Sequence, residues 1–262
     1  MSAELPGVHQ GPDAGSGRVL AWVSAGAASA VAASLALKQG PVTLAYADTR
    51  SEHSDNARFL DDLEEWYGQP ILRLGSEKYH DVWDVWKRRK FIMGHHGAPC
   101  TVHLKKEVRF AFQQPDDRHV FGYTIEEKDR VEQLLRSDPG LDVWCPLIDE
   151  GLDKQDCFAM IEQAGLRLPA IYDLGYDNAN CIGCPKGGMG YWTLGIRKDF
   201  PEVYDRMAGL ERSLDHSLFD VFLDEMPAEG RGNFKRDQPR NCSILCAISE
   251  DNLHASDESG TP

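Results

Sequence analysis

Apolar positions in the first half of the chain form short continuous runs, and these runs alternate with segments that favour helix. Residues 18–23 (Arg-Val-Leu-Ala-Trp-Val) and 42–47 (Val-Thr-Leu-Ala-Tyr-Ala) are two such runs. Runs of this length are typical of strands that are buried on both faces of a parallel sheet. Between them, residues 29–38 are rich in good helix formers, and Gly40 and Pro41 end that segment. The pattern predicts a β-α-β unit with a right-handed crossover.

The same alternation continues to about residue 140. It predicts helices over residues 55–67, 79–89 and 101–112, a third strand over 70–74 and a fourth over 120–123. An amphipathic helix is predicted over 153–165, and the chain behind it is rich in glycine, cysteine and aromatic residues. The expected fold class is α/β, with an open, mostly parallel sheet flanked by helices and a small helical, cysteine-containing C-terminal part.

Charge and hydropathy narrow the possible functions. The 28 basic and 42 acidic residues give a formal net charge of −14, which disfavours general affinity for nucleic acid or anionic membranes. Residues 86–90 (Trp-Lys-Arg-Arg-Lys) are the one dense basic run, and they are either a phosphate-binding patch or a solvated helix face. No apolar run is long enough to span a membrane, and no secretory signal is recognisable, so we expect a cytoplasmic protein.

The segment between the first strand and the first helix contains only small side chains: Ser24, Ala25, Gly26, Ala27, Ala28 and Ser29. Small residues let backbone N–H groups approach an anion, and the helix that follows adds the positive end of its dipole. The two serine hydroxyls can each add a hydrogen bond, so the segment is a candidate phosphate cradle without a lysine. The alternative is a tight turn that needs small residues for packing alone. A Gly-x-x-x-x-Gly-Lys-Ser/Thr sequence is absent, which excludes the P-loop of kinases and GTPases.

This segment resembles the Ser-Gly-Gly-x-x-Ser element of PP-loop ATP pyrophosphatases and of the phosphoadenosine-phosphosulfate (PAPS) reductase family. Ala25 replaces the first glycine, and an alanine there is expected to have an ordinary backbone conformation. The resemblance extends over residues 18–246 through four further motifs and is strongest to reductase-like members from phages and bacteria. Those motifs are 55–60, 97–105, 122–130 and 181–192. The resemblance implies an adenine nucleotide alpha hydrolase-like fold, ATP as a substrate and Mg²⁺ as its counter-ion.

Three residues outside the loop are candidates for the nucleotide site. Asp48 ends the second predicted strand, where open α/β sheets bind their ligands, and its alternative role is a turn or helix cap. Lys105 matches the lysine that faces the nucleotide phosphates in the family, which makes it a candidate catalytic residue. Arg130 is a second candidate for countering phosphate charge. The alternative for Lys105 and Arg130 is a solvated helix charge.

The chain has seven cysteines, and an odd number without a secretory signal favours thiols or metal ligands over disulfides. Cys181 and Cys184 form a C-x-x-C in a glycine-rich loop whose N–H groups are expected to point at the sulfurs. This spacing suits a redox dithiol, half of a zinc site or half of an iron–sulfur site. Cys100 follows Gly-Ala-Pro and is expected to be exposed enough to bind a metal. Cys157 is expected in the core, and the role of Cys145 is open.

Related PP-loop enzymes of sulfur transfer contain a [4Fe–4S] cluster, and this resemblance implies such a cluster here. Its expected ligands are Cys100, Cys181 and Cys184, with a fourth among Cys145, Cys242 and Cys246. The structural alternative is a zinc ion held by Cys181, Cys184, Cys242 and Cys246. Cys242 and Cys246 are also candidate catalytic residues that carry a persulfide.

The leading hypothesis is an enzyme that binds ATP, adenylates an acceptor with release of pyrophosphate, and takes part in sulfur transfer. The acceptor is a nucleic acid or a small molecule, and the sulfur comes from a donor protein or a thiol. The runner-up is reduction of PAPS or adenylylsulfate to sulfite, although residues 240–247 lack the Glu-Cys-Gly-Ile/Leu-His motif of those reductases. The third is a non-catalytic nucleotide-binding module with structural zinc. An oligomer is compatible with all three.

The expected domain organisation follows from these assignments. Residues 1–17 are a disordered lead-in, 18–145 the PP-loop nucleotide-binding domain, 146–250 the helical region with the cysteine site, and 251–262 a disordered tail.

Overall fold

The computed structural model describes residues 17–94 and 97–239. The predictions made for Cys242 and Cys246 therefore lie outside the described residues, as do those for most of the expected lead-in and for the tail.

Five parallel strands form one sheet in the order β3-β2-β1-β4-β5. The strands are β1 (Val19–Trp22), β2 (Thr43–Asp48), β3 (Leu72–Gly75), β4 (Arg118–Val120) and β5 (Asp142–Trp144). At the centre, Leu20 of β1 is paired in register with Thr43 on one side and with His119 on the other. The α/β class with an open, parallel sheet flanked by helices is confirmed.

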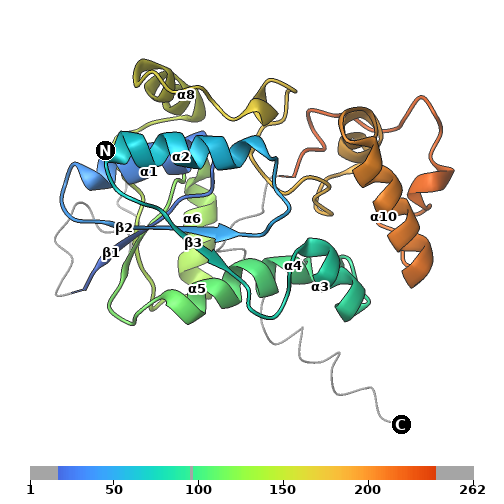
Figure 1. Ribbon diagram of the computed structural model, residues 1–262, viewed down its shortest axis with the longest axis horizontal. Coiled ribbons are helices and arrows are strands. Elements are labelled where there is room, and N and C mark those ends of the chain that lie inside the picture. Colours follow the sequence, from blue (N-terminus) through green and yellow to red (C-terminus); the bar gives the residue numbers. More distant parts are fainter. Residues whose placement is uncertain (1–16, 95–96, 240–262) are drawn as a thin grey trace, which may run out of the picture. The chain divides into compact units, whose positions relative to one another are not determined.

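The crossovers change direction at the middle of this sheet. Helices α1 (Ala27–Leu37) and α2 (Asp55–Tyr67) lead from β1 to β2 and from β2 to β3, and Figure 1 shows both on one face, with α5 (Glu107–Phe112) on the other. Helix α6 (Lys128–Ser137) leads from β4 to β5 in the opposite direction, so a right-handed crossover places it opposite α1. The reversal lies between β1 and β4, and open α/β sheets bind ligands at such a switch point.

The remaining helical segments are shorter or follow the sheet in sequence. The α-helices are α3 (Val82–Arg89), α4 (Pro99–Thr101), α7 (Pro146–Asp149), α8 (Lys154–Gln163), α9 (Arg197–Asp199) and α10 (Pro201–Leu214). The 3₁₀ turns are η2 (Ile125–Glu127), η3 (Ala170–Tyr172) and η5 (Leu223–Glu225), and the π-helical segments are η1 (Val102–Lys106) and η4 (Tyr191–Ile196). None of the helices in the described part of the chain combines the length and apolar character that a bilayer crossing requires.

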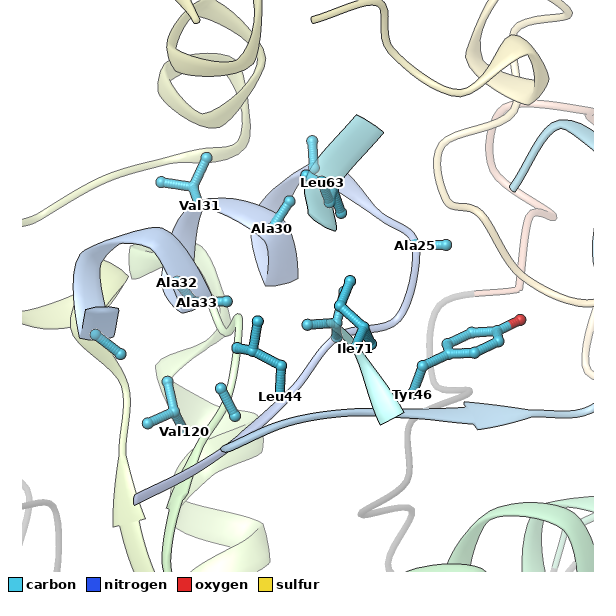
Figure 2. Packing of buried hydrophobic residues seen from close by; sticks show 14 of the residues in the cluster. Ala25, Ala30, Val31, Ala32, Ala33, Leu44, Tyr46, Leu63, Ile71 and Val120 are labelled. Atoms are coloured by element: carbon cyan, nitrogen blue, oxygen red, sulfur yellow. The ribbon is translucent and has the colours of Figure 1, made fainter. Parts of the chain in front are cut away.

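Helix α1 is buried almost all round, because residues of the sheet, α2, α7 and α8 join one hydrophobic cluster with it. Its buried side chains are mostly alanines, and Figure 2 shows them gathered near Leu44 and Val120 of the sheet. Alanine favours helix and lets a helix lie close to a sheet. The Tyr67 hydroxyl, at the end of α2, donates a 2.8 Å hydrogen bond to the Ala30 carbonyl. These contacts hold α1 against the sheet and α2.

The described residues divide into two compact units. The first unit contains residues 17–48, 52–75 and 108–179, and therefore the whole sheet. The second unit contains residues 49–51, 76–107 without 95–96, and 180–239. The domain boundary expected after residue 145 stays a prediction.

The fourth strand lies earlier than the sequence predicts. Instead of residues 120–123, β4 covers Arg118–Val120. Arg118 and His119 are buried because each has a polar partner: the Arg118 Nε atom is 3.1 Å from Asp142 Oδ2, and His119 Nδ1 accepts the Trp22 Nε1–H at 3.0 Å. A buried strand whose first two residues are polar has no apolar run by which it can be recognised.

Candidate functional site

The loop that follows β1 leaves the sheet at its carboxyl edge, beside the switch point. The Val23 N–H still donates to the Ala45 carbonyl at 2.8 Å, so the pairing with β2 continues one residue beyond β1. The chain then turns through Ala25 into α1, which begins at Ala27. The small-residue segment predicted as a phosphate cradle is therefore placed where ligands of open α/β sheets bind.

Ala25 has a left-handed backbone conformation, with φ of 54°, and is fully buried. The expectation of an ordinary conformation at this position was wrong. A left-handed alanine costs roughly 1–2 kcal/mol, whereas glycine adopts it freely. The loop thus keeps a glycine-type geometry although it has an alanine, and strain of this kind is concentrated at functional sites.

Ser29 organises the loop through its side chain. Its Oγ–H donates to the Gly26 carbonyl at 2.9 Å, and its oxygen accepts the Ser24 backbone N–H at 2.9 Å and the Ser24 hydroxyl at 3.0 Å. In this conformation both serine hydroxyls therefore bond within the loop. Ser29 is buried, whereas Ser24 is exposed. The Ser24 hydroxyl can turn toward an anion without unfolding the loop.

At the N-terminus of α1, the described residues supply one side-chain acceptor, the Tyr172 hydroxyl, which accepts the Ala27 N–H at 3.4 Å. Gly26 is the N-cap residue, so the N–H groups of Ala28 and Ser29 have neither an intrahelical acceptor nor a capping oxygen. A Cβ atom added to Gly26 would lie 3.3 Å from the Tyr172 hydroxyl and 3.6 Å from Ser24 Oγ. The space beside Gly26 is thus flanked by two hydroxyls and lies at the positive end of an 11-residue helix.

Gly122, two residues beyond β4, packs against the first turn of α1. A Cβ atom added there would lie 2.5 Å from both the N and the Cα atom of Ser29, closer than real Cβ atoms approach other atoms. The sequence places Gly122 in the motif 122–130 but gives no sign that it contacts α1. Residues 29 and 122 are far apart along the chain, and no local pattern links them.

The hydroxyl of Tyr172 is the functional group at this site that sequence reasoning missed. Tyr172 ends η3, and its oxygen accepts the Ala27 N–H at 3.4 Å. Burial raises the pKa of Tyr172 to about 12, so the phenol is protonated at neutral pH. No sequence motif marks Tyr172 as a site residue, and only the tertiary fold brings it to α1.

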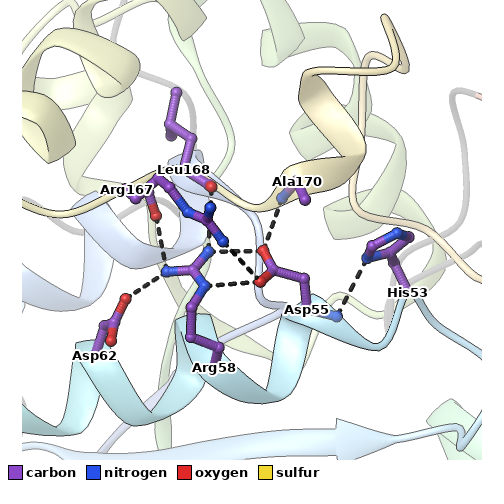
Figure 3. Close-up of polar contacts among 7 residues, drawn as sticks. All are labelled: His53, Asp55, Arg58, Asp62, Arg167, Leu168 and Ala170. Atoms are coloured by element: carbon purple, nitrogen blue, oxygen red, sulfur yellow. Dashed lines mark hydrogen bonds and ion pairs between the residues drawn. The ribbon is translucent and has the colours of Figure 1, made fainter.

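An ion-pair network holds the segment that leads to Tyr172 (Figure 3). The Asp55 carboxylate binds the guanidinium of Arg58 at 2.7 Å and that of Arg167 at 3.1 Å, and accepts the Ala170 N–H at 2.8 Å. Arg58 also donates to the Leu168 carbonyl at 3.1 Å. The hydrogen bond from Arg58 holds the pKa of Asp55 well below its usual value, and the N–H of Ala170 adds to this. We call residues 167–172 the arm.

The other predicted nucleotide-binding residues are distributed over both units. Asp48 ends β2 in register with Gly75, at the same edge of the sheet as the loop after β1. Arg130, in α6, forms an ion pair with Glu127 and lies 5.0 Å above the ring of Tyr123. Lys105 is buried in the π-helical η1 of the second unit. The roles expected of Asp48, Arg130 and Lys105 stay predictions.

The C-x-x-C loop belongs to the second unit, and side-chain hydroxyls contact both its first sulfur and its backbone N–H groups. Cys181 Sγ lies 3.1 Å from Thr49 Oγ1. The N–H groups of Gly183 and Cys184 both donate to the Tyr191 hydroxyl at 3.1 Å. The expectation that N–H groups of this loop point at the sulfurs does not hold for these two, because a tyrosine oxygen accepts both.

The other described cysteines are buried as well. Cys100, expected to be exposed enough to bind a metal, is 9% exposed and lies in α4, which begins at Pro99. Cys157 lies in the hydrophobic core as predicted, and burial raises the pKa of its thiol to about 12. Cys145, in the first unit, is fully buried, which raises the pKa of its thiol. Over residues 17–94 and 97–239, no three His, Cys, Asp or Glu side chains form a group able to hold a metal ion.

The basic run lies on α3 of the second unit. Trp83 and Trp86 are buried with their ring centroids 5.0 Å apart, whereas Lys87, Arg88 and Lys90 are exposed. The run is therefore a solvent-facing positive surface on an acidic chain.

Comparison with solved structures finds a likeness to the phosphoadenylyl-sulfate (PAPS) reductase of Candida auris, crystallised as a phosphate complex. The TM-score is 0.46 and the sequence identity 14%, over 63% of this chain and 81% of that chain. No protein-family model and no curated protein matches the sequence.

Proposed function

We propose that the protein is a PP-loop type enzyme that binds ATP at residues 24–29 and transfers its adenylyl group to an acceptor, with release of pyrophosphate. The observation that carries this proposal is the pair of uncapped N–H groups, those of Ala28 and Ser29, beside Gly26 at the switch point of a parallel sheet. Uncapped N–H groups at a helix N-terminus bind phosphate well. Two hydroxyls border the space beside Gly26, where an added Cβ atom would be in tight contact with that of Tyr172, at 3.3 Å, and in ordinary contact with that of Ser24, at 3.6 Å. Both hydroxyls are placed to donate to a phosphate oxygen in that space.

In the proposed reaction, a nucleophilic atom of the acceptor bonds to the α-phosphorus while the bond to the bridging oxygen of the β-phosphate breaks. Pyrophosphate leaves with the bonding electron pair, and negative charge develops on the phosphate oxygens. The N–H groups of Ala28 and Ser29 and the Ser24 hydroxyl would stabilise that charge. Mg²⁺, when bound, neutralises charge on the phosphates, and the Asp48 carboxylate at the same edge is our candidate to hold it.

The proposal is tested by calorimetric titration of ATP and Mg²⁺ into the protein and two glycine variants. Gly26→Ala places a methyl group in the cradle, and φ of −109° at Gly26 accommodates alanine without strain. We expect ATP affinity to fall at least about tenfold, because the phosphate loses its place against the helix. Gly40→Ala is the matched control, since its added Cβ meets no atom within 4 Å. Equal affinity of Gly26→Ala and the wild type would contradict the proposal.

Product analysis then separates the two enzymatic reactions. The proposed enzyme releases pyrophosphate from ATP in the presence of its acceptor, either a nucleic acid or a small molecule. Sulfite release from PAPS with a dithiol would instead assign the reductase reaction. ATP binding with neither product would leave a nucleotide-binding module.

Sulfur transfer through a [4Fe–4S] cluster remains part of the proposal, and no reaction step is assigned to it. Cys100, Cys181 and Cys184 all belong to the second unit, and no group of three such side chains forms among the described residues; the fourth ligand of a cluster would come from Cys145, Cys242 or Cys246. Iron, sulfide and zinc analysis of anaerobically purified protein tests this. We expect Cys184→Ser to lose the metal and Cys157→Ser, in the core, to retain it.

A further inference from the structure

The Tyr172 hydroxyl faces the proposed phosphate cradle from outside the loop. It lies 3.4 Å from the Ala27 nitrogen and would lie 3.3 Å from a Cβ atom on Gly26. Ser24 Oγ would lie 3.6 Å from the same Cβ atom. Two hydroxyls from segments distant in sequence thus flank one small space.

The hydrogen bonds of Tyr172 leave its own hydrogen available. The oxygen accepts the N–H of Ala27 at 3.4 Å. A phenol has one hydrogen to donate in addition to its acceptor lone pairs. Within the described residues the structure shows no acceptor for that hydrogen. Phosphate oxygens only accept hydrogen bonds, so a phosphate beside Gly26 would complete the bonding of Tyr172.

The ring of Tyr172 is held firmly enough to act as a fixed donor. It packs against Phe158 with ring centroids 5.0 Å apart, and the Lys154 ammonium lies 5.8 Å from its centroid. Asp55 and Arg58 fix the preceding residues of the arm. A donor held in place before the ligand arrives loses little conformational entropy on binding.

We propose that Tyr172 is a ligand-binding residue of the phosphate site, and that its hydroxyl donates a hydrogen bond to a phosphate oxygen held beside Gly26. This inference rests on the proposed nucleotide binding at residues 24–29. The group recognised is a terminal or bridging phosphate of a nucleotide. Tyr172, from η3, would donate to it in addition to the donors of the loop.

The test is calorimetric titration of pyrophosphate, ATP and adenosine into Tyr172→Phe, which removes the hydroxyl and keeps the ring. We expect affinity for pyrophosphate and ATP to fall about tenfold, the effect of one hydrogen bond to a charged group, and affinity for adenosine to stay unchanged. Tyr67→Phe is the matched control, because the Tyr67 hydroxyl also bonds α1, at the Ala30 carbonyl, but away from the cradle. It is expected to bind all three ligands as the wild type does.

The outcomes distinguish a failure of the role proposed for Tyr172 from a failure of the proposed nucleotide binding. If Tyr172→Phe binds pyrophosphate and ATP as tightly as the wild type or more tightly, the role of Tyr172 is refuted and nucleotide binding stands. An equal loss for adenosine would assign Tyr172 a structural role and refute the inference as well. If the wild type binds neither pyrophosphate nor ATP, both proposals fail.

Discussion

Gly122, two residues beyond β4, packs directly against the backbone of Ser29 in the first turn of α1. The two segments that leave the sheet at the switch point are therefore in contact, and the position of the helix start depends on the absence of a side chain at residue 122. The geometry of the proposed phosphate site is thus set partly from a strand distant in sequence.

Gly122→Ala is expected to displace the start of α1, because its Cβ would lie 2.5 Å from backbone atoms that cannot rotate away. Overpacking of this kind lowers the free energy of unfolding by about 1–3 kcal/mol. We also expect weaker ATP binding, measured by calorimetry beside urea denaturation. Gly140→Ala is the control, since nothing lies within 4 Å of its added Cβ. Wild-type ATP affinity in Gly122→Ala would show that the helix start does not bind the nucleotide.

Ala25→Gly tests whether the left-handed conformation is strained. Ala25 and Ala27 are both buried, so replacing either by glycine removes one buried methyl group. Only Ala25 has positive φ, and relief of its strain offsets about 1–2 kcal/mol of the loss. In urea denaturation we therefore expect Ala27→Gly to be less stable than Ala25→Gly by about that amount. Equal losses would mean that Ala25 is unstrained.

The arm is expected to depend on Asp55 more than on its neighbour Asp62. Asp55 binds two guanidinium groups and a backbone N–H, and its side chain is 15% exposed. Asp62, among the residues that the structure describes, binds Arg58 alone. Asp55→Asn should lower the free energy of unfolding at pH 7 by about 2 kcal/mol, as expected for charged hydrogen bonds. Asp62→Asn should lower it by less than about 1 kcal/mol, as expected for a surface pair. A similar loss in both variants would contradict the assigned role of Asp55.

The stabilisation by Asp55 also has a defined pH dependence. Because the folded-state pKa of Asp55 is depressed, its contribution is fully present above about pH 4 and is lost as the pH falls through the folded-state value. The difference in stability between the wild type and Asp55→Asn should therefore shrink below pH 4. Urea denaturation at pH 7 and pH 3 measures this, and a constant difference would show that Asp55 does not act as a carboxylate.

Much of the sheet and the loop could be predicted from the sequence, because buried parallel strands and small-residue turns have local signatures. The helix over residues 55–67 was predicted with the limits that α2 has. In contrast, β5 and α6 were not predicted. Strand β5 is only three residues long and begins with Asp142, and α6 is a mostly polar helix.

The candidate site was only partly predictable, for a related physical reason. Residues 24–29 are contiguous, and their small side chains mark them as a loop. Tyr172 and Gly122 reach that loop only through the fold, and a single glycine or tyrosine has many other roles. The left-handed conformation of Ala25 could not be foreseen, because alanine seldom adopts it unless its surroundings enforce it.

His119 is expected to make the fold sensitive to mild acid. Its ring is buried, accepts the Trp22 N–H and lies parallel within 5° to the rings of Trp22 and Phe121. Burial lowers its pKa to about 4, so below pH 6.5 the unfolded chain takes up a proton that the folded state excludes. Between pH 7 and pH 5 the free energy of unfolding should fall by about 2 kcal/mol from this group. His119→Gln should remove this contribution to the pH dependence of the free energy of unfolding. An unchanged pH dependence would contradict the role assigned to His119.

The central claim is that residues 24–29 hold the phosphates of a nucleotide, and a crystal structure with a non-hydrolysable ATP analogue and Mg²⁺ tests it most directly. We expect a phosphate beside Gly26, within hydrogen-bonding distance of the Ala28 and Ser29 N–H groups and of the Tyr172 hydroxyl. An analogue bound elsewhere, with Ser24 and Ser29 still bonded to each other and no phosphate at the start of α1, would contradict the account.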